Sequence, residues 1–168
     1  MARAMGVLVG MAVGFAIVAL LFKKKVIDMT FDERQELARG KAYQYGFFTL
    51  MGCCFFYGLT DTFFGTWCDT ITGCTLCVCV ALTVFAVTCI RKDAYLSLKE
   101  KPGTVMTMFA IIGVVNLALG GVYIASGDMV QDGILTFHAV NPIFGLMALL
   151  ILLVYLVNYV LERGEGAE

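Results

Sequence analysis

Residues 71–90 read ITGCTLCVCVALTVFAVTCI, an unbroken apolar stretch without Asp, Glu, Lys or Arg that is followed directly by Arg91 and Lys92. A helix rises about 1.5 Å per residue, so a stretch of this length can cross a hydrocarbon layer roughly 30 Å thick. Lipid offers the backbone no hydrogen-bond partners, and a helix satisfies these groups within itself. The stretch therefore predicts a membrane-spanning helix and an all-α fold class.

Four further apolar blocks extend this pattern over the rest of the chain. They cover residues 6–22, 43–60, 105–126 and 139–161. Of the 168 residues, 60% are hydrophobic and 15% are charged, and the mean hydropathy is +0.87, whereas soluble domains are about 45–50% apolar and about 25% charged. The sequence predicts a single membrane domain over residues 1–168, a polytopic helical protein with five transmembrane helices in the lipid bilayer. The formal net charge of -1 argues against a nucleic-acid partner.

The basic residues lie in alternate connecting segments. Residues 23–42 and 91–104, together with the tail after residue 161, hold every Lys and Arg except Arg3. Short cytoplasmic segments are enriched in these residues, so we expect 23–42 and 91–104 to be cytoplasmic, with the N-terminus outside and the C-terminus inside. The other two loops contain acidic residues but no basic ones: Asp61, Asp69, Asp128 and Asp132.

The first predicted span carries small residues at a helical spacing. Gly6, Gly10 and Gly14 recur every fourth residue and so share one face of a helix. Such faces let membrane helices approach closely. Two interpretations stay open: a homo-oligomer or partner-subunit interface, or packing against the other spans of this chain. A second cluster of small residues in the fourth span could receive the first span: Gly113, Gly120, Gly121 and Ala125.

A helix is predicted to begin near Phe31, before the second span. Thr30 and Glu33 have the spacing of a capping box, and only Gly40 interrupts the helical pattern from there into the span. This segment could be a helix at the membrane interface or a docking site for a cytoplasmic partner.

Part of this segment resembles a known group of proteins. Residues 32–35, DERQ, and 39–43, RGKAY, lead into an aromatic-rich span. From Asp32 to Tyr43 the chain is similar to small integral membrane proteins of Gram-positive bacteria that belong to families of unknown function. The resemblance implies a multi-pass protein of the bacterial cytoplasmic membrane and an accessory role in regulation, and it supplies no catalytic residue.

The chain has seven cysteines, which lie in and around the second and third spans. Cys74 and Cys77 form a Cys-x-x-Cys pair, and Cys68 precedes them in an acidic loop. Three interpretations stay open: inert packing thiols, a structural disulfide from Cys68 to Cys74 or Cys77, and thiol–disulfide chemistry. The layout resembles quinone-linked membrane oxidoreductases, although the second cysteine pair and the nearby Arg of those enzymes are missing. With His138 as its only histidine, the chain is not expected to bind a metal.

Few polar residues fall within the predicted spans. Asn116 lies near the middle of the fourth span, where we expect an interhelical hydrogen bond or, alternatively, a solute contact in a small channel or facilitator. Before the fifth span, His138 could bind a cation together with Asp128 and Asp132. Asn141 and Pro142 have the pattern of an N-cap and a first helical turn.

These patterns favour a non-enzymatic membrane protein, a structural, regulatory or accessory subunit that acts through helix packing and needs no cofactor. The alternatives are a thiol oxidoreductase that uses Cys74, Cys77 and Cys68, and a small channel or facilitator. We found no phosphate-binding loop, nucleophile elbow, zinc-protease helix or pair of catalytic carboxylates in the sequence.

Overall fold

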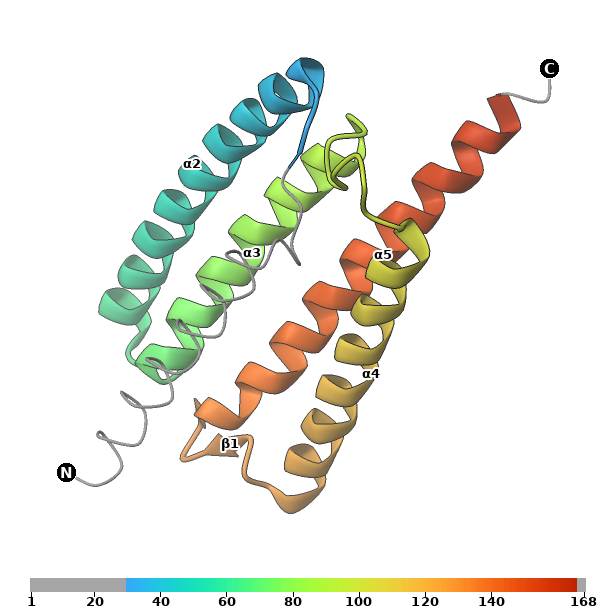
Figure 1. Ribbon diagram of the computed structural model, residues 1–168. Coiled ribbons are helices and arrows are strands. Elements are labelled where there is room, and N and C mark those ends of the chain that lie inside the picture. Colours follow the sequence, from blue (N-terminus) through green and yellow to red (C-terminus); the bar gives the residue numbers. More distant parts are fainter. Residues whose placement is uncertain (1–29, 166–168) are drawn as a thin grey trace.

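The computed structural model describes residues 30–165, with side chains as far as residue 161. It contains four long helices, α2 (Glu33–Phe64), α3 (Thr70–Ile90), α4 (Pro102–Ser126) and α5 (Val140–Glu165) (Figure 1). Each is long and apolar enough to cross a membrane, so the all-α class and a multi-pass membrane protein hold for the described residues. The first predicted span, with Gly6, Gly10 and Gly14, lies outside them.

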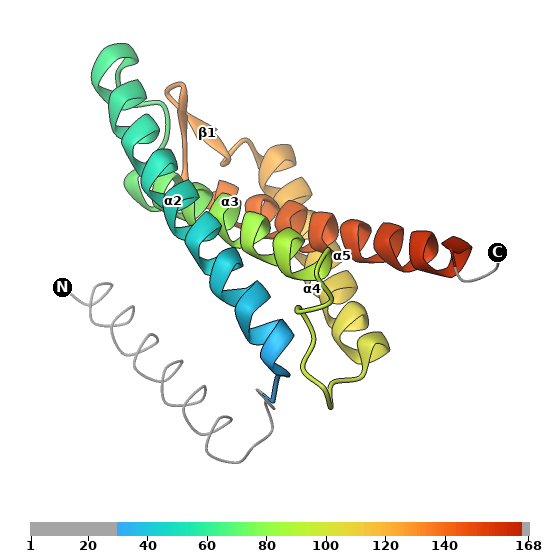
Figure 2. The same ribbon diagram turned by 90° about the horizontal axis from the view of Figure 1, so that it is seen from above.

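The helices form two antiparallel hairpins that lie side by side (Figures 1 and 2). In one hairpin α2 packs on α3, in the other α4 packs on α5, and α3 joins the two by packing against α5. Between α4 and α5 the chain forms a short β-hairpin, β1 (Val130–Gln131) and β2 (Ile134–Leu135), and the 3₁₀ helix η1 (Phe137–Ala139).

Glycines set the close approach of α4 to α5. A Cβ at Gly120 would lie 2.9 Å from the Cβ of Pro142, and a Cβ at Gly113 would lie 2.5 Å from Leu149 Cδ2. These two glycines, expected to receive the first span, are therefore covered by α5. Gly121 differs, because a Cβ there would meet no described residue within 4 Å.

The beginning of α2 corrects one sequence prediction. The N-cap is Asp32, whose Oδ1 accepts from the Gln35 backbone N–H at 2.7 Å, and Gln35 Oε1 accepts from the Asp32 N–H at 3.2 Å. The capping box thus uses Asp32 and Gln35, two residues after the predicted Thr30 and Glu33 pair. Asp32 is as good an N-cap as a threonine, because its carboxylate accepts a hydrogen bond from the backbone. The prediction that this helix continues into the second span is confirmed, since α2 runs unbroken over 32 residues.

The fifth span begins differently from the prediction as well. Thr136 is the N-cap of η1, and α5 follows directly from Val140. Asn141 is therefore the second residue of α5, and its prediction as the N-cap is wrong because η1 already prepares the helical turn. Pro142 does lie in the first turn of α5, as predicted, where a missing backbone N–H costs nothing.

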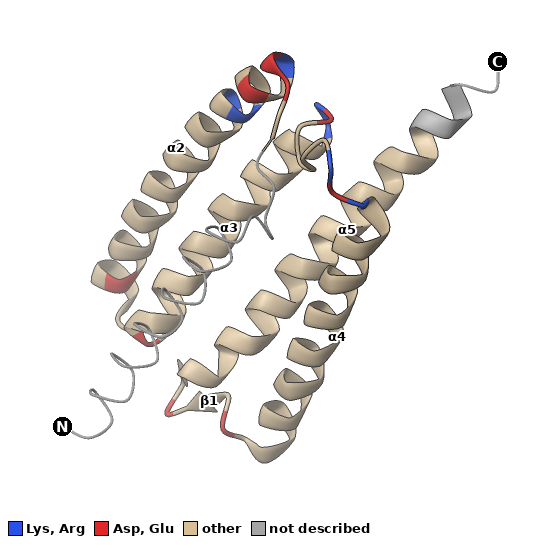
Figure 3. Cartoon of the chain, viewed as in Figure 1, with Lys and Arg blue, Asp and Glu red and all other residues tan. Residues whose placement is uncertain are grey.

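Acidic residues lie at both ends of the described bundle, whereas the described Lys and Arg lie at one end only (Figure 3). Lys and Arg gather at the end formed by the start of α2 and the α3–α4 loop, which we call the basic end. The opposite end, which we call the acidic end, carries acidic residues and no Lys or Arg among the described residues: Asp61, Asp69, Asp128 and Asp132. Which end faces the cytoplasm remains a prediction from the sequence.

Candidate functional site

Two loops meet at the acidic end and enclose Cys68. The Leu135 backbone N–H donates to the carbonyl of Trp67 at 2.9 Å, and the Asp69 N–H donates back to the Leu135 carbonyl at 2.8 Å. The Thr72 hydroxyl adds a bond to the Thr136 carbonyl at 3.0 Å. We call these three bonds the loop clasp. Cys68, between Trp67 and Asp69, is 0% exposed.

An aromatic pair covers the Cys68 thiol. The Tyr57 hydroxyl lies close to this thiol, and the Tyr57 ring meets Trp67 edge to face at 5.9 Å between centroids. The same ring rests on Gly73, where any Cβ would overlap it. Glycine at position 73 therefore lets Tyr57 lie flat against α3 and reach Cys68.

The surroundings of Cys68 keep its thiol protonated. Burial raises the pKa of Cys68 most strongly, and the nearby Asp69 and Asp61 carboxylates raise it further, while the hydrogen bond from Tyr57 acts in the opposite direction. The thiolate is the reactive form of cysteine. A buried thiol with a raised pKa is a poor nucleophile, so Cys68 has the properties of a structural thiol.

The Cys-x-x-Cys pair is divided between two environments. Cys77 is buried, and its thiol lies close to the thiol of Cys54 on α2. Cys74 is exposed and lines a shallow groove with Phe144 of α5. All seven cysteines are free thiols, so the structure contains no disulfide from Cys68 to Cys74 or Cys77.

Cys54 is the partner that the sequence analysis missed. The pairing of α2 with α3 puts Tyr43 against Phe85 at 4.6 Å between ring centroids, and Tyr57 against Gly73. In an antiparallel hairpin, a later residue of the first helix faces an earlier residue of the second. With this register, Cys54 of α2 lies opposite Cys77 of α3. The register of the α2–α3 hairpin could have identified Cys54 as the neighbour of Cys77. The Cys-x-x-Cys spacing could not, because it relates residues of one helix only.

An apolar cavity lies beside Cys77. Its volume is about 320 Å³, and its wall includes Cys53 and Cys77 together with the rings of Phe56, Tyr57 and Trp67. Nearly all of the wall is apolar, and apolar or aromatic molecules suit such a site. The arrangement could therefore bring an apolar molecule next to the Cys77 thiol.

The remaining candidates take part in local contacts. Asn116 Nδ2 donates to the carbonyl of Ile112 in its own helix at 2.8 Å, so the bond that Asn116 makes among the described residues lies within α4. His138 stacks on Tyr123 at 4.3 Å between centroids, and Asp128 accepts from Ser126 at 2.7 Å. The described residues include no group of three or more His, Cys, Asp or Glu able to hold a metal ion.

Comparison of the chain with protein-family models, curated proteins and solved structures gives no match.

Proposed function

We propose that this chain is a non-enzymatic integral membrane protein of the bacterial cytoplasmic membrane, a structural, regulatory or accessory subunit that acts through helix–helix packing. The observation that supports the proposal is a stripe on α2, the α2 stripe, that the described chain leaves uncovered. Its members alternate at spacings of three and four residues, the pattern by which helices interdigitate: Tyr45, Phe48, Gly52, Phe55 and Leu59.

The α2 stripe has the properties of an unfilled packing surface. Among its members, Phe48 is 68% exposed and Phe55 is 71% exposed. A Cβ at Gly52 would meet no described residue within 4 Å, so the small residue at the centre of the stripe accommodates no neighbour from the described part of the chain. The most apolar part of α2 is nowhere buried by the other described residues. Close packing around small residues is a main source of helix association in lipid.

The Gly6, Gly10 and Gly14 face is the second surface in this proposal. The test measures association of the full chain in mild detergent by native mass spectrometry, with co-purifying proteins identified. We expect an assembly that Gly10→Leu or Gly52→Leu dissolves. Ala12→Leu is the matched control, because residue 12 lies on the opposite side of the predicted helix. A strictly monomeric wild-type protein without a co-purifying subunit would refute the proposal.

A thiol oxidoreductase is the second candidate, and the contact between Cys54 and Cys77 beside an apolar cavity favours it. In that reaction the two thiols form one disulfide and release two protons and two electrons to a membrane quinone. Membranes incubated with a quinone, quenched with a maleimide and analysed as non-reduced peptides test this. A Cys54–Cys77 disulfide that Cys54→Ala abolishes and Cys79→Ala leaves intact would support it, and two free thiols throughout would exclude it.

A further inference from the structure

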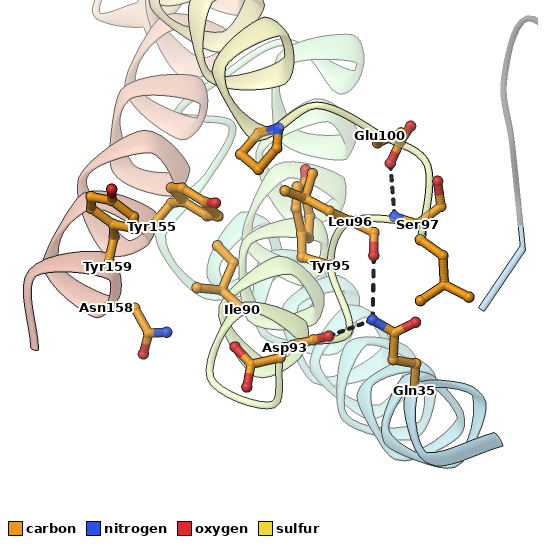
Figure 4. A pocket seen from close by; sticks show the side chains of 12 residues that line it. Gln35, Ile90, Asp93, Tyr95, Leu96, Ser97, Glu100, Tyr155, Asn158 and Tyr159 are labelled. Carbon is orange, nitrogen blue, oxygen red and sulfur yellow. Dashed lines mark hydrogen bonds between the residues drawn. The ribbon is translucent and has the colours of Figure 1, made fainter. Parts of the chain in front are cut away.

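A second cavity, of about 280 Å³, lies at the basic end (Figure 4). Tyr155, Asn158 and Tyr159 of α5 form one side of it, and Asp93 and Tyr95 from the segment after α3 form the other. This cavity is at the opposite end of the bundle from Cys68 and the loop clasp. It therefore stands independently of both candidate functions above.

Hydrogen bonds hold the loop side of the cavity in place. Gln35 Nε2 donates to the Asp93 carbonyl at 2.6 Å, which ties the loop to the first turn of α2 (Figure 4). A Glu100 carboxylate oxygen accepts from the Ser97 backbone N–H at 2.9 Å. The Leu98 N–H donates to the Thr30 carbonyl at 3.0 Å. The cavity is thus preformed, and a ligand would not need to order its wall.

The charged residues in the described part of the wall have one sign. Asp93 and Glu100 contribute carboxylates, and none of the described Lys or Arg residues lines the cavity. The nearest ion pair, from Arg34 to Asp93, spans 3.9 Å between side chains that are 71% and 58% exposed, and such surface pairs contribute little. Among the described residues the wall therefore carries two carboxylates and no cation, although Lys and Arg lie close to it at the basic end.

Aromatic rings supply the rest of the recognition surface. Tyr95, Tyr155 and Tyr159 line the cavity, and the faces of such rings attract cations. Burial raises the pKa of Tyr95 to about 12, so its phenol stays neutral and keeps its proton as a hydrogen-bond donor. The Ser97 side chain, 5% exposed, also lines the cavity, and its hydroxyl has no partner among the described residues.

We propose that this cavity binds a small alkylammonium group, as found in choline and ethanolamine and in the lipid headgroups built from them. The tyrosine faces stabilise the cation, and Asp93 and Glu100 balance its charge. An anion would be repelled by the two carboxylates, and a wholly apolar ligand would leave them without a counter-charge. Free choline and a lipid headgroup present the same chemistry to this wall.

The test is calorimetric titration of choline into the full chain in nanodiscs of phosphatidylglycerol, which has no ammonium group. We expect saturable binding that Asp93→Asn and Glu100→Gln each weaken by about three- to tenfold. Gln at position 100 can still accept from Ser97 N–H. Asp132→Asn is the matched control for position 93, because both aspartates adopt a φ of 51°. Tyr159→Leu should weaken binding similarly, with Tyr43→Leu, at an exposed position outside the α2 stripe, as its control.

Two further experiments distinguish a lipid headgroup from a free ammonium compound and test whether binding needs the positive charge. In nanodiscs that contain phosphatidylethanolamine, loss of choline binding by competition would identify a lipid headgroup as the ligand, and unchanged binding would identify a free ammonium compound. Both outcomes support recognition of the ammonium group. Equal binding of the uncharged isostere, in which a tert-butyl group replaces trimethylammonium, would overturn the proposal. So would the absence of saturable choline binding in phosphatidylglycerol nanodiscs, or unchanged affinity in the folded carboxylate variants.

Discussion

Gly120 and Gly121 are neighbours in α4 with opposite surroundings. A Cβ at Gly120 would press on the rigid ring of Pro142, and a Cβ at Gly121 would meet open space. We expect Gly120→Ala to lower the free energy of unfolding by about 1–3 kcal/mol, as overpacking does, and Gly121→Ala to cause no loss. Thermal unfolding of the two detergent-solubilised variants measures the difference. Equal stabilities would contradict the α4–α5 packing described above.

The buried thiol of Cys68 makes stability depend on pH in the alkaline range. Because the folded state holds the pKa of Cys68 above its ordinary value, the unfolded chain loses this proton first as the pH rises past about 8.5. The free energy of unfolding should therefore fall with pH above that point and be insensitive to Cys68 below it. Comparison of denaturation curves for the wild type and Cys68→Ala tests this, since the variant should show a shallower alkaline decline. Identical declines would contradict it.

The same burial determines how Cys68 reacts. From its place in an acidic loop the sequence left inert packing, a disulfide and thiol–disulfide chemistry open for Cys68, and the structure shows that the loop clasp closes over it. The Cys-x-x-Cys spacing likewise placed Cys74 and Cys77 in one site, whereas the hairpin register pairs Cys77 with Cys54. Residue types and spacings along one helix could identify the cysteines of interest. They could not identify contacts between helices, which depend on how far each helix slides along its neighbour.

At the scale of elements, Gln35 joins the first turn of α2 to the α3–α4 loop. Its side chain completes the capping box with Asp32 and donates to the Asp93 carbonyl. We expect Gln35→Ala to cost about 1–2 kcal/mol and to speed hydrogen exchange at the Leu98 amide. Exchange followed by mass spectrometry measures this. Gln131→Ala, at an exposed strand position, is the matched control, and equal exchange in both variants would refute the role of Gln35.

Helix positions were largely predictable, and helix beginnings were not. All four predicted spans that fall in the described residues coincide with long helices, because length and hydropathy are properties of the local sequence. The beginnings of α2 and α5 depended on competition between neighbouring capping groups, Asp32 against Thr30 and Thr136 against Asn141. That competition is decided by tertiary partners, such as the loop carbonyl that binds Gln35, which a local pattern does not contain.

For the whole molecule, the charge pattern makes a prediction about orientation. In a cysteine-free background, we expect a membrane-impermeant maleimide to label Asp132→Cys in intact cells and to leave Lys99→Cys unlabelled until the cells are opened. The reason is that cytoplasmic segments accumulate Lys and Arg, and Lys99 lies in the α3–α4 loop, which belongs to the basic end. The reverse labelling pattern would contradict the proposed topology and show that the acidic end faces the cytoplasm.

The loop clasp also has a consequence for the order in which the chain is made. Its partners, Trp67 and Asp69 on one side and Leu135 and Thr136 on the other, are separated by two entire helices. During synthesis the α2–α3 hairpin, which carries Tyr57 and Trp67, is complete while Leu135 and Thr136 have not yet been translated. We therefore expect the growing chain to pass through an intermediate in which the aromatic pair alone covers this thiol and the loop clasp has not yet formed. Protection of Cys68 from thiol reagents during translation would report the arrival of the second hairpin.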